Sequence, residues 1–128
     1  KNGSKKLIVV EKDKNLSIFL NKKFKDKINI INEDILKINE KKIYKEKLIV
    51  FGNLPYNISS QILVKFLRFK VWPPKFNDLI LMFQKEVANR IIAKFNTPEY
   101  GRLSILSNWK LNIKNSKEIR KEICMIAA

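Results

Sequence analysis

The stretch LIVFGNLPY, residues 48–56, decides how this sequence is expected to fold. Its first four residues are apolar and include β-branched and aromatic side chains, which favour a buried strand over 48–51. Gly52 and Pro55 end that strand, and a helix is predicted to begin at Ser59. The helix carries four apolar residues at helical spacing: Ile62, Leu63, Phe66 and Leu67. A strand, a polar turn and a helix in this order are typical of one unit of an α/β fold.

Strands and helices alternate on both sides of this stretch. The elements expected are a strand over 5–11, a helix from Asp13 or Asn15 to about Phe24 with Leu16, Phe19 and Leu20 on one face, a strand over 28–32, a break at Trp72–Pro74, a strand over 79–83 and a helix over 86–94. Parallel strands need crossover connections, which are usually helices. The alternation therefore predicts an α/β fold with a mainly parallel sheet and flanking helices.

Polar residues follow three of the predicted strands: Glu11, then Glu33-Asp34, then Asn53. Right-handed crossovers bring the carboxyl ends of parallel strands to one edge of a sheet, where nucleotide-like ligands bind in folds of this class. Each of these residues alone is also explained as a turn residue or a helix cap. Three in succession favour a ligand site.

The charge of the chain points to a polyanionic partner. The 128 residues include 27 Lys and Arg against 12 Asp and Glu, a formal net charge of +15, and 45% are hydrophobic, enough for one core. Basic residues release counterions when they meet phosphates, so nucleic acid is the leading partner. An A/T-rich coding sequence, which also enriches Lys, Ile and Asn, is the alternative explanation.

The residue types that are missing exclude several chemistries. The chain has no His and a single Cys, Cys124, so it forms no Ser-His-Asp triad, no Cys-His pair and no Cys/His zinc site, and no metal is expected. One Cys forms no internal disulfide, and the sequence has neither a signal peptide nor an apolar run long enough to span a membrane. We therefore expect a cytoplasmic protein without a membrane partner.

The tetrapeptide Asn53-Leu54-Pro55-Tyr56 resembles the [DN]-x-P-[YF] box of methyltransferases that modify exocyclic amino groups, including N6 of adenine. The N6 lone pair is delocalised into the ring, so the amine attacks poorly until two acceptors take its N–H hydrogens. The resemblance makes the side-chain oxygen of Asn53 and the carbonyl of Leu54 these acceptors. Pro55 fixes the backbone beside that carbonyl, and Tyr56 offers a flat face to an extruded base.

Three wider segments resemble a particular family. They are FGNLPYNISS (51–60), FQKEVANR (83–90) and YGRLS (100–104). Together they are similar to the small-subunit ribosomal RNA adenine N6-dimethyltransferases, and the resemblance covers roughly residues 7–109. It implies a Rossmann-like class I methyltransferase sheet that uses S-adenosyl-L-methionine to methylate adenines of small-subunit rRNA during ribosome maturation. The related large-subunit erythromycin-resistance enzymes share the box but typically lack the second and third segments.

The resemblance also implies roles for single residues. Glu11 would accept hydrogen bonds from the ribose hydroxyls of the cofactor, Asp34 would read the amino group of its adenine, and Ile35 would pack on that ring. Asn53 would lie where the cofactor and the target base meet. Phosphate contacts are expected from Lys85, Arg90 and Arg102, for which a solvated charged face is the alternative, and Tyr100-Gly101 is explained equally well as a turn.

Two parts of the family pattern have no counterpart here. The family's E-x-G-x-G-x-G turn is missing, since Gly occurs only at positions 3, 52 and 101, and so is its Pro-rich A-F-x-P-x-P-x-V segment. We expect an internal fragment: a partial catalytic domain over 1–112, lacking the first strand and the Gly-rich turn, and an unassigned tail over 113–128. The lost strand belongs between those of Glu11 and Phe51, which would face a gap or pair directly. Such a chain is expected to be marginally stable and to transfer methyl groups poorly.

Two other functions remain open. One is a non-catalytic RNA-binding protein of ribosome assembly that keeps the fold as a scaffold, which the missing Gly-rich turn favours and the intact Asn53–Tyr56 box opposes. The other is a large-subunit rRNA adenine methyltransferase of the erythromycin-resistance type. In each case the partner is ribosomal RNA, with the small-subunit precursor preferred, and the protein is expected to be a monomer.

Overall fold

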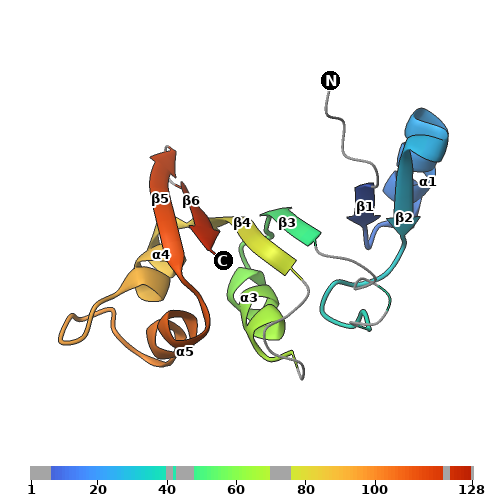
Figure 1. Ribbon diagram of the computed structural model, residues 1–128. Coiled ribbons are helices and arrows are strands. Elements are labelled where there is room, and N and C mark those ends of the chain that lie inside the picture. The colour runs from blue at the N-terminus through green and yellow to red at the C-terminus, as the bar shows by residue number, and fades with distance from the viewer. Residues whose placement is uncertain (1–6, 40–41, 43–47, 70–75, 120–121, 128) are drawn as a thin grey trace. The chain divides into compact units, whose positions relative to one another are not determined.

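The computed structural model of the chain describes residues 7–39, 42, 48–69, 76–119 and 122–127, and its elements fall into two units, residues 1–43 and 44–128 (Figure 1). The expected break at Trp72–Pro74 lies outside the described residues.

The first unit is a strand, a helix and a second strand. Its elements are β1 (Leu7–Val10), α1 (Lys14–Phe24), a 3₁₀ turn η1 (Lys25–Lys27) and β2 (Ile28–Ile31). β1 and β2 pair in parallel, as expected of a mainly parallel sheet, and their register places Leu7 opposite Ile28. The Asp13 side chain caps α1 by accepting a hydrogen bond from the Leu16 amide at 2.8 Å, so the first of the two proposed caps is confirmed.

The predicted apolar face of α1 is only partly covered. Leu16 and Phe19 remain 44% and 56% exposed, and Ser17 is the one buried residue of this helix. The helix therefore forms where the sequence predicts it, but it buries little apolar surface.

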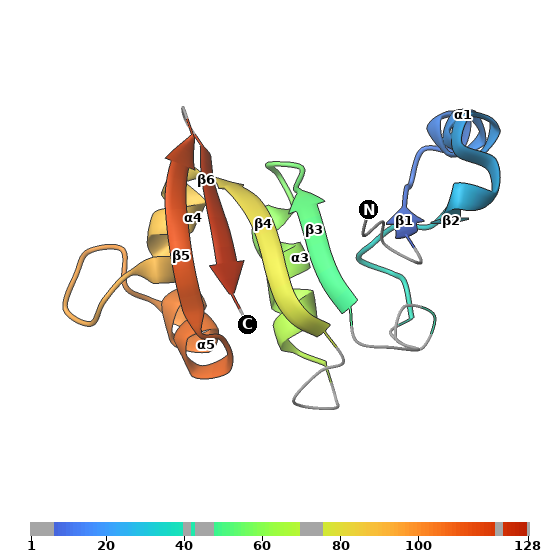
Figure 2. The same cartoon turned by 45° about the horizontal axis from the view of Figure 1, so that its top comes forward.

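The second unit is a four-stranded sheet with helices on one face. Its elements are β3 (Leu48–Asn53), α3 (Ser59–Leu67), β4 (Phe76–Gln84), α4 (Lys85–Ile92), α5 (Arg102–Lys110), β5 (Ile113–Ile119) and β6 (Glu122–Ala127). The strand order is β3-β4-β6-β5: β3 and β4 are parallel, whereas β6 runs antiparallel to both neighbours. Figure 2 shows α3, α4 and α5 on the same face of this sheet.

The core of the second unit lies between α3 and β4. Alternate β4 residues, Leu79, Leu81 and Phe83, are at most 2% exposed, because successive side chains of a strand point to opposite faces. The apolar α3 residues of the sequence pattern, Ile62, Leu63, Phe66 and Leu67, are buried as predicted. Phe66, Phe69 and Phe76 close one end of this core with edge-to-face ring contacts at 5.5–6.3 Å.

Three features differ from the sequence-based expectations. Helix α5 forms where the sequence was read only as a turn, at Tyr100-Gly101, and two strands of the tail that was left unassigned, β5 and β6, pair as an antiparallel hairpin. The hairpin also makes this sheet mixed rather than parallel.

Candidate functional site

The box Asn53–Tyr56 begins at the last residue of β3 and leads into α3. Asn53 is exposed and lies opposite Met82 of β4 in the parallel ladder. Beyond the strand, the Ile58 amide donates a hydrogen bond to the Pro55 carbonyl at 3.2 Å. The buried Ser59 hydroxyl donates to the Tyr56 carbonyl at 3.4 Å. The turn is therefore tied to the first turn of α3 and to the edge of the sheet.

Gly52 lets the box fold back closely on the sheet. A Cβ atom at this position would lie 2.7 Å from Cδ2 of Leu54 and 3.0 Å from Cδ2 of Leu81, both shorter than ordinary van der Waals contacts. The absent side chain thus leaves room for Leu54, whose carbonyl is one of the two expected acceptors.

Three side chains of the box are exposed: those of Asn53, Pro55 and Tyr56, with Tyr56 54% exposed. An amide oxygen, a nearby main-chain carbonyl and a half-exposed aromatic ring are the groups needed to hold a planar base by its amino group.

In the first unit, Glu11 and Asp34 follow the carboxyl ends of β1 and β2. Oε1 of Glu11 accepts a hydrogen bond from the Asp13 amide at 2.8 Å, and the Glu11 amide donates to the Ile31 carbonyl at 3.1 Å. The Asn32 side chain donates to the Glu11 carbonyl at 2.8 Å and to the Lys12 carbonyl at 3.2 Å. Asn32, which the sequence analysis missed, therefore joins the two strand ends.

Asp34 is held in its ionised form by its surroundings. Its Oδ1 accepts from the Leu36 amide at 2.9 Å, and Oδ2 pairs with Nζ of Lys12 at 3.2 Å. The Leu36 hydrogen bond and the Lys12 ammonium lower the pKa of the Asp34 carboxyl, against a smaller opposing effect of desolvation. Ile35, half-buried, sits inside the turn that the Asp34 carbonyl closes by accepting from the Lys37 and Ile38 amides.

The predicted site residues are thus found in two groups. Glu11, Asp34 and Ile35 gather at one end of the first unit, and Asn53–Tyr56 form a continuous turn in the second. That the two groups share one binding edge stays a prediction.

The residues expected to contact phosphates lie on or beside α4 and α5. Lys85 and Arg102 are exposed first residues of these helices, and Arg90 pairs with Glu86 at 2.6 Å on the solvent side of α4. Inside the YGRLS segment, the buried Ser104 hydroxyl accepts from the Gly101 amide at 3.0 Å and donates to the Arg90 carbonyl at 2.7 Å. This segment therefore fastens α5 to α4, a role that the sequence analysis did not assign.

Two negative findings concern the described residues alone. They contain no group of three or more His, Cys, Asp or Glu side chains arranged to hold a metal ion. None of their helices has the length and apolar character to cross a membrane.

The fold matches solved methyltransferase structures. A dimethyladenosine transferase from Plasmodium falciparum superposes with a TM-score of 0.76 at 21% identity, covering 96% of this chain and 47% of that one. The 23S rRNA methyltransferase ErmE gives a TM-score of 0.66 at 20% identity, covering 97% and 52%. The predicted Rossmann-like methyltransferase fold is confirmed.

Sequence comparison gives a more specific result. A family model described as ribosomal RNA adenine dimethylase matches residues 1–124, further than the 7–109 of the sequence-based resemblance. The chain is 55% identical over 125 residues to the ribosomal RNA small subunit methyltransferase A of Pelagibacter ubique, covering 95% of this chain and 47% of that protein. The protein of the same name from Zymomonas mobilis is 42% identical over 98 residues, covering 77% and 35%. The chain spans about half or less of these relatives' length, and it belongs to the ribosomal RNA adenine dimethylase family.

Proposed function

We propose that this chain is the base-positioning part of an enzyme that transfers methyl groups from S-adenosyl-L-methionine to N6 of adenines in small-subunit ribosomal RNA. The observation that carries the proposal is the box Asn53–Tyr56, exposed at the carboxyl end of β3 and fixed by hydrogen bonds to α3. The substrate is ribosomal RNA or a small-subunit precursor, and the enzyme acts as a cytoplasmic monomer.

Asn53 and Leu54 prepare the amine for attack. The Asn53 amide oxygen and the Leu54 carbonyl accept the two N–H hydrogens of N6, which localises the nitrogen lone pair out of the ring system. Tyr56 stacks on the extruded base and holds its plane. N6 gains a methyl group and gives up one proton to solvent in each transfer. The acceptors take two N–H hydrogens in the first transfer and the one that remains in the second, and fixed acceptors need no reorganisation when the charge develops.

Glu11 and Asp34 fit the adenosine half of the methyl donor. Asp34 is ionised and each carboxylate oxygen can accept more than one hydrogen bond, so both groups can take further donors beyond their contacts within the unit. When bound, the donor supplies an electrophilic methyl group with a sulfonium leaving group. The sequence of this chain contains no Gly-rich turn for the methionine half of the donor, because its only glycines are at positions 3, 52 and 101.

The test places the chain in a full-length enzyme, by exchanging it for the matching 125 residues of the Pelagibacter ubique relative. Radiolabelled methyl transfer to small-subunit rRNA is then measured for this hybrid and for Asn53→Ala. Loss of one fixed acceptor is expected to lower kcat about a hundredfold. RNA affinity should change less than about twofold, because the lost contact acts mainly in the transition state.

Asn77→Ala is the matched control, since Asn77 is an exposed residue of β4 outside the three family segments. It should transfer at the rate of the unchanged hybrid. Equal transfer by the Asn53→Ala and unchanged hybrids would overturn the mechanism.

The same assay separates the other functions. A hybrid that binds ribosomal RNA but transfers no methyl group would support the scaffold function. Transfer to large-subunit rather than small-subunit rRNA would support an enzyme of the erythromycin-resistance type.

A further inference from the structure

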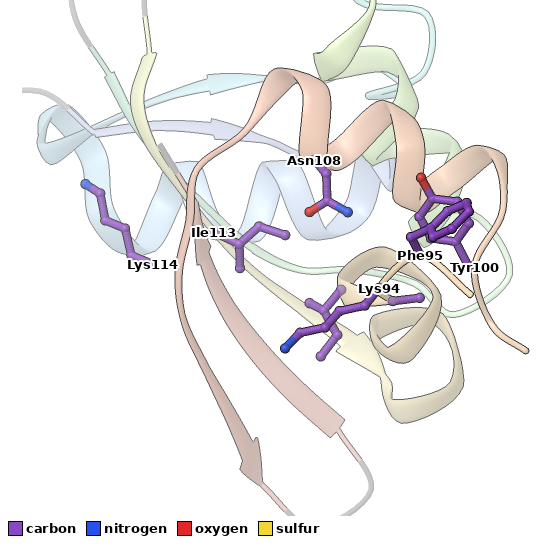
Figure 3. A pocket seen from close by; sticks show the side chains of 8 residues that line it. Lys94, Phe95, Tyr100, Asn108, Ile113 and Lys114 are labelled. Atoms are coloured by element: carbon purple, nitrogen blue, oxygen red, sulfur yellow. The ribbon is translucent and has the colours of Figure 1, made fainter. Parts of the chain in front are cut away.

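A hollow in the second unit lies apart from the Asn53–Tyr56 box. It has a volume of about 580 Å³, within the range of small-molecule sites, and is formed by the end of α4, the loop after it, α5 and the start of β5. Figure 3 shows Phe95 and Tyr100 together at one end, with the Asn108 side chain extending from α5. None of its lining residues belongs to the box.

Phe95 stands at this hollow with its ring open to solvent. It is 82% exposed and contacts Tyr100 edge-to-face, with ring centroids 5.7 Å apart. The edge-on contact holds the position of the ring and leaves most of its surface uncovered. A fixed, uncovered aromatic ring is suited to stacking on a flat ligand.

The loop that carries Phe95 is internally hydrogen-bonded. The Thr97 hydroxyl and amide both donate to the Lys94 carbonyl, at 2.8 and 3.2 Å, and the Tyr100 amide donates to the Thr97 carbonyl at 3.0 Å. Asn96 takes a left-handed conformation with φ of 67°, which Asn tolerates better than most residues. The ring is therefore presented in one place, and little conformational entropy is lost when it binds a ligand.

The charge around the hollow is positive. Lys94 and Lys114 line it, and no Asp or Glu is among the described lining residues. Lys114 is paired with Asp78 at 3.1 Å, whereas no carboxylate in the described part of the chain pairs with Lys94. Of the two lysines that line the hollow, Lys94 is thus the one more available to an anion.

We propose that this hollow binds one nucleotide of a single-stranded RNA segment, with the base stacked on Phe95 and its phosphate paired with Lys94. Asn108 offers both a donor and an acceptor to the base edge. Aromatic platforms beside basic side chains are the common means of holding single-stranded nucleic acid, and the chain carries +15 overall. This inference rests on the proposed function, because that function makes RNA the expected ligand. It adds a site that anchors the RNA away from the reacting base.

The test measures binding of a fluorescein-labelled single-stranded RNA of about 12 nucleotides to the 128-residue chain by fluorescence anisotropy. Phe95→Ala is expected to weaken binding about tenfold, and Phe95→Trp should restore it, because stacking needs only a flat face. Phe19→Ala is the matched control, since Phe19 is also exposed but lies on α1; it should change affinity less than about twofold.

Lys94 is tested through the salt dependence of the same binding. Lys94→Gln should reduce the slope of log affinity against log salt by about 0.7, the value for one phosphate contact on a single strand. Lys14→Gln, an exposed lysine at the start of α1, serves as the control and should leave the slope unchanged.

Crosslinking checks the site without any substitution. Ultraviolet irradiation of the wild-type chain with the RNA should attach nucleotides to Phe95 or Tyr100, as located by mass spectrometry of the peptides. Absence of RNA binding, equal affinities of Phe95→Ala and Phe19→Ala, or crosslinks confined to other segments would overturn the proposal.

Hydrogen exchange shows whether the hollow binds RNA or another polypeptide. RNA should slow the exchange of the amides of residues 94–97, 99 and 100. If these amides are instead protected as protein concentration rises without RNA, the hollow receives another polypeptide and the proposal fails.

Failure of the RNA anchor and failure of the proposed methyl transfer give different results in these experiments. Loss of methyl transfer in Asn53→Ala with no effect of Phe95 on RNA binding would reject the anchor alone. A Phe95-dependent affinity in a chain whose hybrid transfers no methyl would reject the enzymatic function alone.

Discussion

Glu11 and Asp34 are held beyond the ends of β1 and β2 by hydrogen bonds from nearby backbone amides. The places of Glu11, Asp34 and Asn53 at or after strand ends could be predicted from the sequence, because each is a polar residue within three positions of the end of an apolar run. Asn32 could not, since its importance lies in two hydrogen bonds to a segment 20 and 21 residues away. Long-range contacts of a single amide leave no local pattern in a sequence.

Asp34 gives a pH-dependent prediction. Its folded-state pKa is lowered, first by the Leu36 amide and then by Lys12, so the ionised carboxylate stabilises the first unit above the unfolded pKa near 4. That stabilisation is lost as the pH falls through the lower folded-state value. Carbon NMR of the Asp34 carboxyl should give this low pKa, and Lys12→Ala should raise it.

Lys14→Ala is the control for this titration, because Lys14 is exposed on α1 and forms no ion pair with Asp34 in the described residues. A midpoint for Asp34 that is the same in the Lys12→Ala and Lys14→Ala variants would contradict the assigned cause.

The helices and strands show where apolar spacing predicts structure and where it does not. α3 and β4 were predictable, because their buried positions carry Leu, Ile and Phe at regular intervals. α5 was missed because its buried positions include Ser104 and Ser107, whereas Ile105 and Trp109 are 53% and 77% exposed. The β5–β6 hairpin was missed because β5 is largely polar and owes its strand structure to pairing with β6.

The two buried serines of α5 provide a test with an internal control. Ser104 makes two hydrogen bonds, to Gly101 and Arg90, whereas the Ser107 hydroxyl has no hydrogen-bond partner among the described residues. Ser104→Ala should lower the free energy of unfolding by about 1–3 kcal/mol, because it leaves a buried donor and acceptor unpaired. Ser107→Ala should cost little or stabilise the chain.

Urea unfolding followed by circular dichroism measures both variants. Equal effects of the two substitutions would show that the Ser104 hydrogen bonds do not fasten α5 to α4.

At the scale of the whole molecule, the two units differ in how much they bury. The second unit has a continuous apolar core under α3, whereas the first has a two-stranded sheet and a helix whose only buried residue is Ser17. Two-stranded sheets are marginal in water without further packing. The sequence predicted the strands and the α-helix of the first unit and β3, α3, β4 and α4 of the second, but the depth of burial depends on packing partners that spacing alone does not reveal.

Native-state hydrogen exchange should therefore separate the units. Amides of β4 are expected to exchange slowly, with the global unfolding of the chain, and those of β1 and β2 to exchange faster through local opening. Equal protection of β2 and β4 in the same sample would indicate one cooperative structure instead.

The side of the sheet away from α3 has a consequence for handling this protein. Ile49 and Phe51 of β3 are 55% and 72% exposed. An exposed apolar strand face favours association between chains, and mutual repulsion of molecules carrying +15 opposes it. Because added salt screens that repulsion, ionic strength sets the concentration at which these chains begin to aggregate.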